Sequence, residues 1–196
     1  MSEGERAEVA AIRERFPEAI LKVKTFRANT FICLKKEFLR EVGFFLRDDD
    51  RFEYKYFSDC TCVDYSTYEH ARDLEERFEV VYNLFSLKGY KRIFLKVGVE
   101  DGETTPSLIP VYAGAEYSER EVWDLFGVVF EDHPSLKRFL LPDDWVGFPL
   151  RKNIGLGGEE VVFAQGFKGP AVEDLAMPHA GESFEGKTGS EDVSGR

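Results

Sequence analysis

Three carboxylates and one histidine stand close together in the sequence, and their side chains could perform acid–base chemistry. Glu119, Glu121 and Asp124 fall within one short predicted helix, and His133 follows it. A carboxylate near a histidine can take a proton from a reacting group and return it, so a stand-alone hydrolase or lyase is one hypothesis. Such an enzyme would need a pocket around His133.

Helix architecture accounts for the same carboxylates more simply. Ser118 is predicted to cap the helix, with Glu121 as its reciprocal partner three residues later, and Gly127 is predicted to end it. Arg120 lies four residues before Asp124, which is close enough for an ion pair on the helix surface. We therefore interpret these residues as structural and expect no catalytic residue in the chain.

A second short helix is predicted after His133. Pro134 is suited to the first turn of a helix, and Leu136, Phe139 and Leu140 follow at helical spacing. His133 would then lie near a helix start, where capping explains its presence without a catalytic role.

The cysteines do not predict a metal site. Cys60 and Cys62 lie on one face of a predicted strand and offer two ligands, whereas zinc and iron–sulfur sites need about four donors at recognisable spacings. With Cys33 they make an odd number in strand-like sequence, which indicates buried, reduced thiols. No glycine-rich phosphate loop lies between a predicted strand and a helix, so a nucleotide site is not expected either.

Composition and charge exclude several classes of function. The chain has 196 residues, 43% of them hydrophobic, which suits one ordinary domain with an appendage. Its formal net charge of −11 argues against nucleic acid as a partner, because that interaction needs Lys and Arg to neutralise phosphates. No apolar run is long enough to cross a bilayer, and the acidic start lacks the features of a signal or transit peptide, so we expect a protein of the bacterial cytoplasm.

The periodicity of the sequence predicts an α+β fold, with a mostly antiparallel or mixed sheet and helices on one side. Residues 35–46 place their apolar side chains at helical spacing, whereas residues 93–99 alternate as a strand does. Residues 88–90 suggest a hairpin, and Asn29 suggests a turn between two earlier strands. The other expected elements are a helix at 5–16, strands at 20–25, 30–34, 54–65 and 77–87, and a helical turn at 106–112.

The composition changes after Asn153, which divides the chain into a domain at 1–153 and a tail at 154–196. The tail holds 9 of the chain's 17 glycines, and it has 8 acidic residues against 3 basic ones, so it cannot form a core alone. Its first half contains apolar residues such as Val161 and Phe163 and is expected to lie extended on a partner. The end of the tail is expected to be disordered.

The segment 118–153 resembles the signature of the C-subunit of the proton-pumping NADH:quinone oxidoreductase, respiratory complex I. Two positions depart from the family pattern: Phe139, where an aliphatic residue is usual, and Asn153, where Asp normally follows the basic pair. The resemblance is weaker upstream and is not recognisable after about residue 155. The residues that carry it, and that we expect to form a signature or an interface, are Glu119, Arg120, Glu121, Asp124, His133, Pro134, Lys137, Arg138, Trp145, Gly147, Pro149, Arg151 and Lys152, together with 125–127, Leu140, Pro142 and the rest of 144–152.

This resemblance implies a soluble structural subunit in the hydrophilic arm of the complex, which supports electron transfer from NADH to quinone coupled to proton translocation. It implies docking against the quinone-site D-subunit and neighbouring iron–sulfur subunits. FMN, iron–sulfur clusters, NADH and a quinone are used by the assembly, and none is expected on this chain. The expected place is peripheral, on the cytoplasmic face of the bacterial inner membrane, with membrane contact only through the assembly. The alternative is the equivalent subunit of a related membrane-bound hydrogenase or photosynthetic-type dehydrogenase complex.

Overall fold

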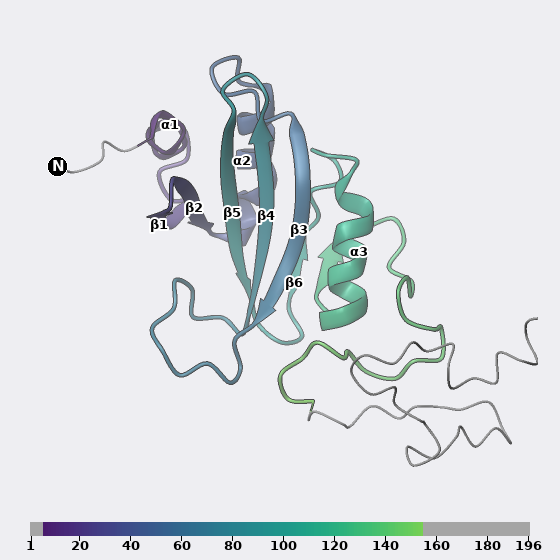
Figure 1. Cartoon of the computed structure of the whole chain (residues 1–196). Helices are drawn as coiled ribbons and strands as arrows, with labels where there is room; N and C mark the ends of the chain where they lie inside the picture. Colours follow the sequence, from purple (N-terminus) through teal and green to yellow (C-terminus); the bar gives the residue numbers. More distant parts are fainter. Residues whose placement is uncertain (1–5, 155–196) are drawn as a thin grey trace, which may run out of the picture. The chain divides into compact units, whose positions relative to one another are not determined.

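A five-stranded sheet forms the centre of the structure, a computed structural model that describes residues 6–154 (Figure 1). The strand order is β1-β2-β5-β4-β3, in which β2 and β5 run parallel and the other neighbouring pairs run antiparallel. This order confirms the predicted α+β class with a mixed sheet. The strands are β1 (Ile20–Phe26), β2 (Asn29–Leu34), β3 (Tyr56–Asp64), β4 (Phe78–Ser86) and β5 (Lys91–Val99).

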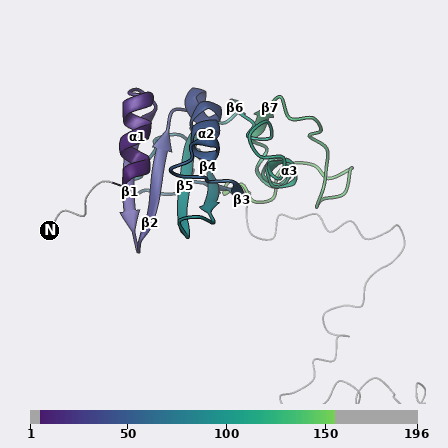
Figure 2. The ribbon, with the colours of Figure 1, turned by 90° about the horizontal axis from the view of Figure 1, so that it is seen from above.

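Helices cover one face of this sheet. α1 (Ala7–Arg15) and α2 (Leu39–Asp48) lie on that face, as Figure 2 shows, and a single 3-10 turn, η1 (Lys36–Phe38), leads into α2. The third helix, α3 (Ala115–Phe126), packs beside the edge strand β3. Both helices predicted in the N-terminal part of the chain are confirmed.

The core lies between the helices and the sheet. On β4, Phe78, Tyr82 and Leu84 point to the covered face and are buried. β5 supplies Ile93 and Leu95 beside them. Burial of each such side chain stabilises the fold by roughly 1.5–3 kcal/mol. Apolar side chains alternate with more polar ones along these strands, and this alternation is what made the strands predictable.

The two predicted turns of the sheet have different outcomes. The hairpin between β4 and β5 forms as expected. The predicted turn between β1 and β2 is present, but it consists of Arg27 and Ala28, with φ values of 49° and 66°, so only the placement of Asn29 in the turn is wrong, because Asn29 is the first residue of β2. A two-residue turn with both φ values positive matches the twist of antiparallel strands, which explains the shift by one residue.

A short strand and one helical turn connect β5 to α3. β6 (Thr104–Pro106) pairs in parallel with β7 (Val129–Glu131), which follows α3. The N–H groups of Val111 and Tyr112 donate to the carbonyl of Leu108 at 2.9 and 2.8 Å, which confirms the predicted helical turn.

The first predicted signature helix is present, but it begins earlier than expected. α3 starts at Ala115, so Ser118 lies inside the helix, and Gly114 occupies the cap position without a side-chain hydrogen bond. The predicted capping box of Ser118 and Glu121 is therefore wrong, because the preceding helical turn passes almost directly into α3. The predicted end is confirmed, since Gly127 follows the helix with a φ of 79°.

The second predicted signature helix does not form. Residues 134–141 contain bends and irregular backbone. The N–H groups of Phe139, Leu140 and Leu141 donate to the carboxylate of Asp124 instead of to carbonyls one turn earlier. A tertiary contact has thus replaced the hydrogen bonds that a helix would need, and the prediction is wrong for that reason.

No helix in the described part of the chain is long and apolar enough to cross a membrane. The predicted division between a domain at 1–153 and a tail at 154–196 falls at the limit of the described residues. The tail's predicted contact with a partner and its predicted disorder lie outside them.

Candidate interaction surface

A buried carboxylate holds the chain that follows α3. The side chain of Asp124 is fully buried, and its Oδ2 accepts the N–H groups of Phe139, Leu140 and Leu141 at 3.1, 2.8 and 3.0 Å. Its Oδ1 accepts Nη1 of Arg138 at 3.0 Å. Burial raises the pKa of Asp124, but the N–H donors and the guanidinium outweigh burial, so the pKa lies below its usual value. An ionised Asp124 therefore fixes this backbone against α3.

The predicted ion pair of Arg120 with Asp124 is wrong. Arg120 instead donates Nε to the carbonyl of Lys137 at 2.6 Å and Nη2 to the carbonyl of Arg138 at 2.7 Å. Asp124 points inward and takes Arg138 as its cation. Both contacts therefore draw the same stretch of chain onto α3.

Arg138 also ties together the loop that follows. Its Nη2 donates to the carbonyls of Trp145 and Gly147 at 2.9 and 3.0 Å. The guanidinium lies over the rings of Trp123 and Phe148, 5.5 and 5.3 Å from their centroids. A planar guanidinium can bond several carbonyls and stack on rings at the same time, which a lysine cannot do.

A second set of anchors returns the chain to the sheet. Arg151 donates Nε to the carbonyl of Phe126 at 2.6 Å. The backbone N–H of Lys152 donates to the buried carboxylate of Asp64 at 3.0 Å, and that carboxylate pairs with Arg77 at 2.9 Å. Burial raises the pKa of Asp64, but Arg77 and backbone donors outweigh it and hold the pKa well below its usual range.

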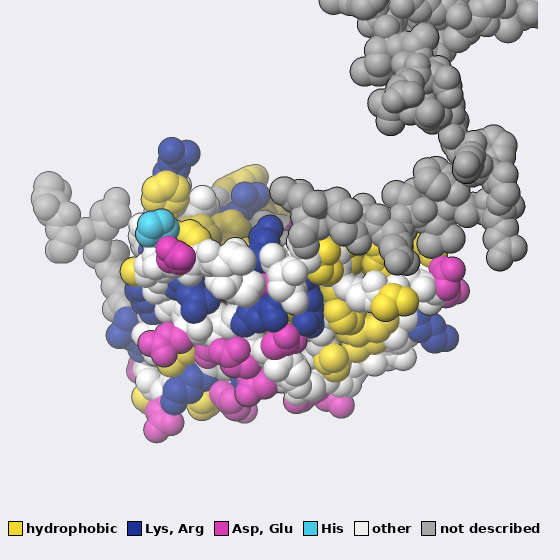
Figure 3. Space-filling model, turned by 90° about the horizontal axis from the view of Figure 1, so that it is seen from below, with side chains coloured by type: hydrophobic (Ala, Val, Ile, Leu, Met, Phe, Trp, Pro, Cys, Tyr) yellow, Lys and Arg dark blue, Asp and Glu magenta, His cyan; other side chains and the backbone are white. Residues whose placement is uncertain are grey.

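The pinned segment, residues 137–152, turns hydrophobic side chains toward solvent while these anchors face inward. Val146 is 94% exposed and Leu140 is 56% exposed. Figure 3 shows hydrophobic side chains gathered on one half of the lower face of the molecule, whereas charged side chains of both signs are mixed over the other half. Contiguous exposed apolar surface of this kind marks interaction sites. The exposed large hydrophobic residues of the pinned segment and of the adjoining surface of α3 are Tyr117, Phe139, Leu140, Val146 and Leu150.

Glu119 points away from this surface and into the core. Its buried side chain accepts the N–H of Leu108 at 2.7 Å, the hydroxyl of Ser107 at 2.6 Å and the hydroxyl of Tyr82 at 3.1 Å. Burial raises the pKa of Glu119 above its usual value, although the three donors act in the opposite direction. The carboxylate thereby links α3 to β4 and to the turn that precedes the helix.

The Glu119→Gln variant is expected to flatten the pH dependence of stability in weak acid. A carboxyl whose pKa is raised by folding stabilises the protein at low pH, and this contribution is lost as the pH rises through the folded pKa. The free energy of unfolding of the wild type should therefore increase as the pH falls from about 7 toward the unfolded pKa of about 4.3. Gln keeps one oxygen for the Leu108 N–H and the Tyr82 hydroxyl, and its NH2 group can donate to the Ser107 hydroxyl oxygen, but it cannot ionise, so this gain should be absent. Urea denaturation across that pH range measures it, with Glu121→Gln on the exposed face of α3 as the control. Equal slopes in wild type and Glu119→Gln would contradict the assignment.

His133 is held by backbone groups and is not placed as a general base. Its Nδ1 accepts the N–H of Ser135 at 3.1 Å, so Nε2 carries the hydrogen and donates to the carbonyl of Glu116 at 3.0 Å. Glu119 is buried in the core and Glu121 is exposed. Each candidate group therefore has different surroundings: His133 bonds backbone groups, Glu119 bonds donors of the core and Glu121 faces solvent.

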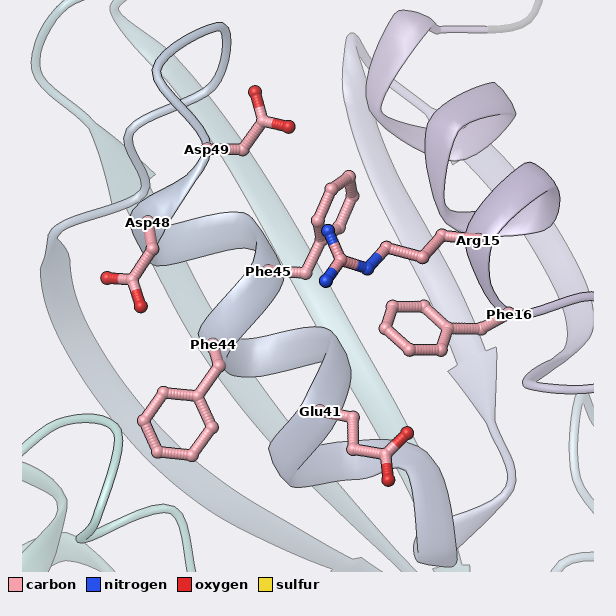
Figure 4. Close-up of a pocket in the computed structure, with 7 residues that line it drawn as sticks. All are labelled: Arg15, Phe16, Glu41, Phe44, Phe45, Asp48 and Asp49. Atoms are coloured by element: carbon pink, nitrogen blue, oxygen red, sulfur yellow. The ribbon is translucent and has the colours of Figure 1, made fainter.

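Two hollows among the described residues lie away from these groups. One of about 510 Å³ lies between α1 and α2, where the guanidinium of Arg15 reaches over the rings of Phe16 and Phe45 (Figure 4). Its carboxylates Asp48 and Asp49 are already paired with neighbouring arginines. The other hollow, of about 430 Å³, lies at the β4–β5 hairpin. Neither is lined by the histidine or the carboxylates of the signature.

The three cysteines lie in the structured part of the chain as free, buried thiols. Cys60 and Cys62 share the covered face of β3, as predicted, and burial raises the pKa of both thiols well above the usual value. Burial also raises the pKa of Cys33, to about 11. Within residues 6–154, no group of three or more His, Cys, Asp or Glu could hold a metal ion.

The other signature residues lie along the pinned segment or just before it. Pro134 and Lys137 are exposed, Trp145 and Pro149 are half-buried, and Gly147 adopts a φ of 87°. The groups on the sheet side that hold the segment were not predicted, because strand-end polar residues carry no distinctive spacing. These groups are Asp64, Arg77 and Asp101, the last of which binds both Arg77 and Arg151.

The mixed sheet, the helices on one of its faces and the pinned segment define an α+β domain. The family described as respiratory-chain NADH dehydrogenase, 30 Kd subunit, matches residues 32–160. The chain is 42% identical over 153 residues to the NADH-quinone oxidoreductase C-subunit of Roseiflexus sp. (strain RS-1), covering 78% of this chain and 84% of that protein. It is 42% identical over 159 residues to the protein of the same name from Geobacter metallireducens, covering 81% of this chain and 93% of that protein.

Two solved structures share the fold. A trypsin-resistant fragment (1-134) of Nqo5 is 30% identical, with a TM-score of 0.54, over 66% of this chain and 99% of the fragment. A chain of the membrane-bound sulfane sulfur reductase, an archaeal respiratory membrane complex, is 26% identical, with a TM-score of 0.59, over 74% of this chain and 82% of that chain. The present chain belongs to the family of the 30 Kd subunit of respiratory-chain NADH dehydrogenase. It is a structural subunit of the hydrophilic arm of the NADH:quinone oxidoreductase, as the resemblance of its signature implied.

Proposed function

We propose that this chain is a non-catalytic scaffold that binds no cofactor and holds neighbouring subunits of the complex in position. The pinned segment is the observation that carries the proposal, because its hydrophobic side chains are exposed while Asp124, Arg138 and Arg151 fix its backbone from within. A segment that is ordered before binding loses little conformational entropy on docking. Rigid presentation of this surface therefore favours a stable interface.

The proposed partners are the quinone-site D-subunit and neighbouring iron–sulfur subunits. Leu140 and Val146 would lie at the centre of the contact, with the exposed basic residues Lys137 and Lys152 on its rim. The tail at 154–196 would continue along a partner. Membership in the family favours this arrangement, with the chain peripheral on the cytoplasmic face of the inner membrane and attached through the assembly.

We assign no step of electron or proton transfer to this chain's own side chains. Thiols whose pKa is raised by burial stay protonated and are poor ligands for iron, which supports binding of the iron–sulfur clusters by other subunits. Asp124 and Glu119 are engaged with fixed donors. The proposed role is to pre-organise sites that other subunits form.

Glu substituted for Leu140 or Val146 is expected to weaken assembly without unfolding the chain. Both side chains are exposed, so the melting temperature of each isolated variant should stay within about 2 °C of wild type. An unpaired carboxylate buried in an interface costs on the order of 2–5 kcal/mol, so the complex recovered with a tagged chain should fall about tenfold or more. The subunit content of the recovered complex, measured by quantitative mass spectrometry, gives the result.

Leu21→Glu serves as the matched control, since Leu21 is 50% exposed on β1, outside the signature. This variant should assemble normally. NADH:quinone activity per intact complex should stay within a few fold of wild type in all three variants. Unchanged assembly in Leu140→Glu and Val146→Glu would contradict the interface. A normalised loss of about hundredfold with intact assembly would point to chemistry on this chain.

A second candidate function is the equivalent role in a related respiratory membrane complex with another electron donor. The likeness to a chain of the sulfane sulfur reductase favours it, because that chain shares the fold at 26% identity. The higher identity to the C-subunits of NADH-quinone oxidoreductases supports NADH as the donor. Oxidation of NADH by the purified native assembly, measured beside alternative donors, distinguishes the two.

A further inference from the structure

A second surface lies at the end of the sheet away from the pinned segment. The β4–β5 hairpin and the turn between β1 and β2 form a hollow of about 430 Å³ there. Asn153 contacts Arg77 just before β4 begins, whereas the hairpin follows the end of β4. The two surfaces therefore lie at opposite ends of this strand, with the hairpin at the upper end in Figure 1.

Positive charge is concentrated at this hollow. Arg6, Lys91 and Arg92 line it, and Arg27 belongs to the adjoining turn. Among residues 6–154, the carboxylate within ion-pair distance of these cations is Glu8, at 3.1 Å from Arg6 and 3.7 Å from Lys91. No ion pair joins Arg27 or Arg92 to a carboxylate in that part of the chain. In a chain with a net charge of −11, this local excess of cations is a site that an anionic partner would neutralise.

One of these cations is fixed in place before any partner binds. Arg6 donates Nη1 to the hydroxyl of Thr30 at 3.1 Å and to the carbonyl of Arg92 at 2.9 Å, and Nη2 to the hydroxyl of Tyr54 at 2.9 Å. The guanidinium thus joins the N-terminal segment to three strands or loops of the domain. Its bond to the carbonyl of Arg92 fixes the backbone at one of the cations that would meet a partner's carboxylate.

Exposed aromatic and aliphatic side chains adjoin these cations. Tyr90 is 85% exposed at the tip of the hairpin, and Leu87 beside it is 63% exposed. Phe85 forms a wall of the hollow, and Phe26 is 53% exposed with the guanidinium of Arg27 over its ring at 5.1 Å. Arginine beside tyrosine and phenylalanine is the composition that recurs at the centre of protein interfaces.

The other hollow and other classes of partner fit less well. Between α1 and α2, Arg15 is accompanied by Glu41, and Asp48 and Asp49 are paired with arginines, so that hollow has no local excess of positive charge (Figure 4). At physiological salt, charges interact strongly only within about 8 Å. A small basic patch on an acidic chain therefore suits a short acidic segment better than a nucleic acid or an anionic membrane.

We propose that this hollow receives an acidic segment of a partner protein, with carboxylates beside Arg27 and Arg92 and an apolar side chain against Tyr90. The proposal goes beyond the scaffold role of the pinned segment, because the two surfaces are separate and either can fail without the other.

Photocrosslinking in the native assembly tests the proposal. The full chain carries p-benzoylphenylalanine in place of Tyr90, or of Leu87 in a second variant, and the irradiated membranes are digested for mass spectrometry. The crosslinked peptide is expected to come from another protein and to be rich in Asp and Glu. The double substitution Arg27→Glu with Arg92→Glu should lower the yield about tenfold, because like charges now face each other.

The matched control is Lys35→Glu with Lys55→Glu, which changes the charge equally but lies outside the hollow. It should leave the crosslink unchanged, and Lys substituted for the acidic residues of the mapped peptide should restore the yield with the double Glu variant. A crosslink to lipid or to residues 155–196 of this chain overturns the proposal. So does a yield unaffected by Arg27→Glu with Arg92→Glu, or the absence of any crosslink from both positions.

Discussion

The Asp124→Ala variant is expected to lose the ordered pinned segment, with a fall of about 3–5 kcal/mol in the free energy of unfolding. Removal of the carboxylate leaves Arg138 without its buried counter-charge and leaves three backbone N–H groups without an acceptor. Each unsatisfied polar group costs on the order of 1–3 kcal/mol if it stays buried, so the segment should detach instead. Urea denaturation of the isolated chain measures the loss, and almost no assembled complex should be recovered.

Two control variants separate this role from a general effect of removing acids from α3. Glu121→Ala lies on the exposed face of the helix and should change stability by less than about 0.5 kcal/mol. Asp124→Asn keeps one oxygen for the N–H groups but loses the charge, so its stability should lie between those of wild type and Asp124→Ala. An Asp124→Ala protein as stable as Glu121→Ala would contradict the assigned anchor.

The lowered pKa of Asp124 predicts the direction of the acid dependence. A carboxyl whose pKa is depressed by folding contributes stability above its unfolded pKa of about 3.9, and that contribution is lost as the pH falls through the folded value. Wild type should therefore lose stability more steeply below about pH 4 than Asp124→Asn. Denaturation curves at acidic pH measure the two slopes.

The sheet and the helices that cover it were predictable because their burial follows local periodicity. Leu39, Val42 and Leu46 recur at helical spacing on α2 and are all buried. The strands bury alternate side chains in the same regular way. The parallel pairing of β2 with β5 was not predictable from the sequence, because no local pattern records which strands become neighbours.

Within the signature, residues 118–153, predictions from local sequence were wrong where a tertiary contact contributes more free energy than a contact within one helix. A surface pair four residues apart on a helix contributes only about 0.3–0.5 kcal/mol. The contacts of the buried Asp124 with one guanidinium and three N–H donors contribute more free energy than that. Asp124 therefore binds Arg138, and Arg120 binds backbone carbonyls instead. The same contact removed the N–H groups that the predicted second helix required. Gly127 was predicted correctly because a positive φ at a helix end is a local demand.

The Gly127→Ala variant is expected to be destabilised by about 2–5 kcal/mol, through two additive causes. The first is the left-handed backbone, since a φ of 79° costs an L side chain roughly 1–2 kcal/mol. The second is crowding, because an added Cβ would lie 2.5 Å from the ring of Phe148 and 2.8 Å from Nη2 of Arg151. Phe148 and Arg151 hold the returning end of the pinned segment, so neither can move without loosening it.

Gly147→Ala separates the two causes. Gly147 has a φ of 87° but nothing within 4 Å of an added Cβ, so it should show the backbone cost alone, roughly 1–2 kcal/mol. Urea denaturation of both variants gives the difference, which measures the crowding at Gly127. Equal destabilisation of the two would mean that the ring of Phe148 and the guanidinium of Arg151 move aside at little cost. The pinned segment would then be held less rigidly than the contacts of Arg151 with Phe126 and of Arg138 with Trp123 indicate.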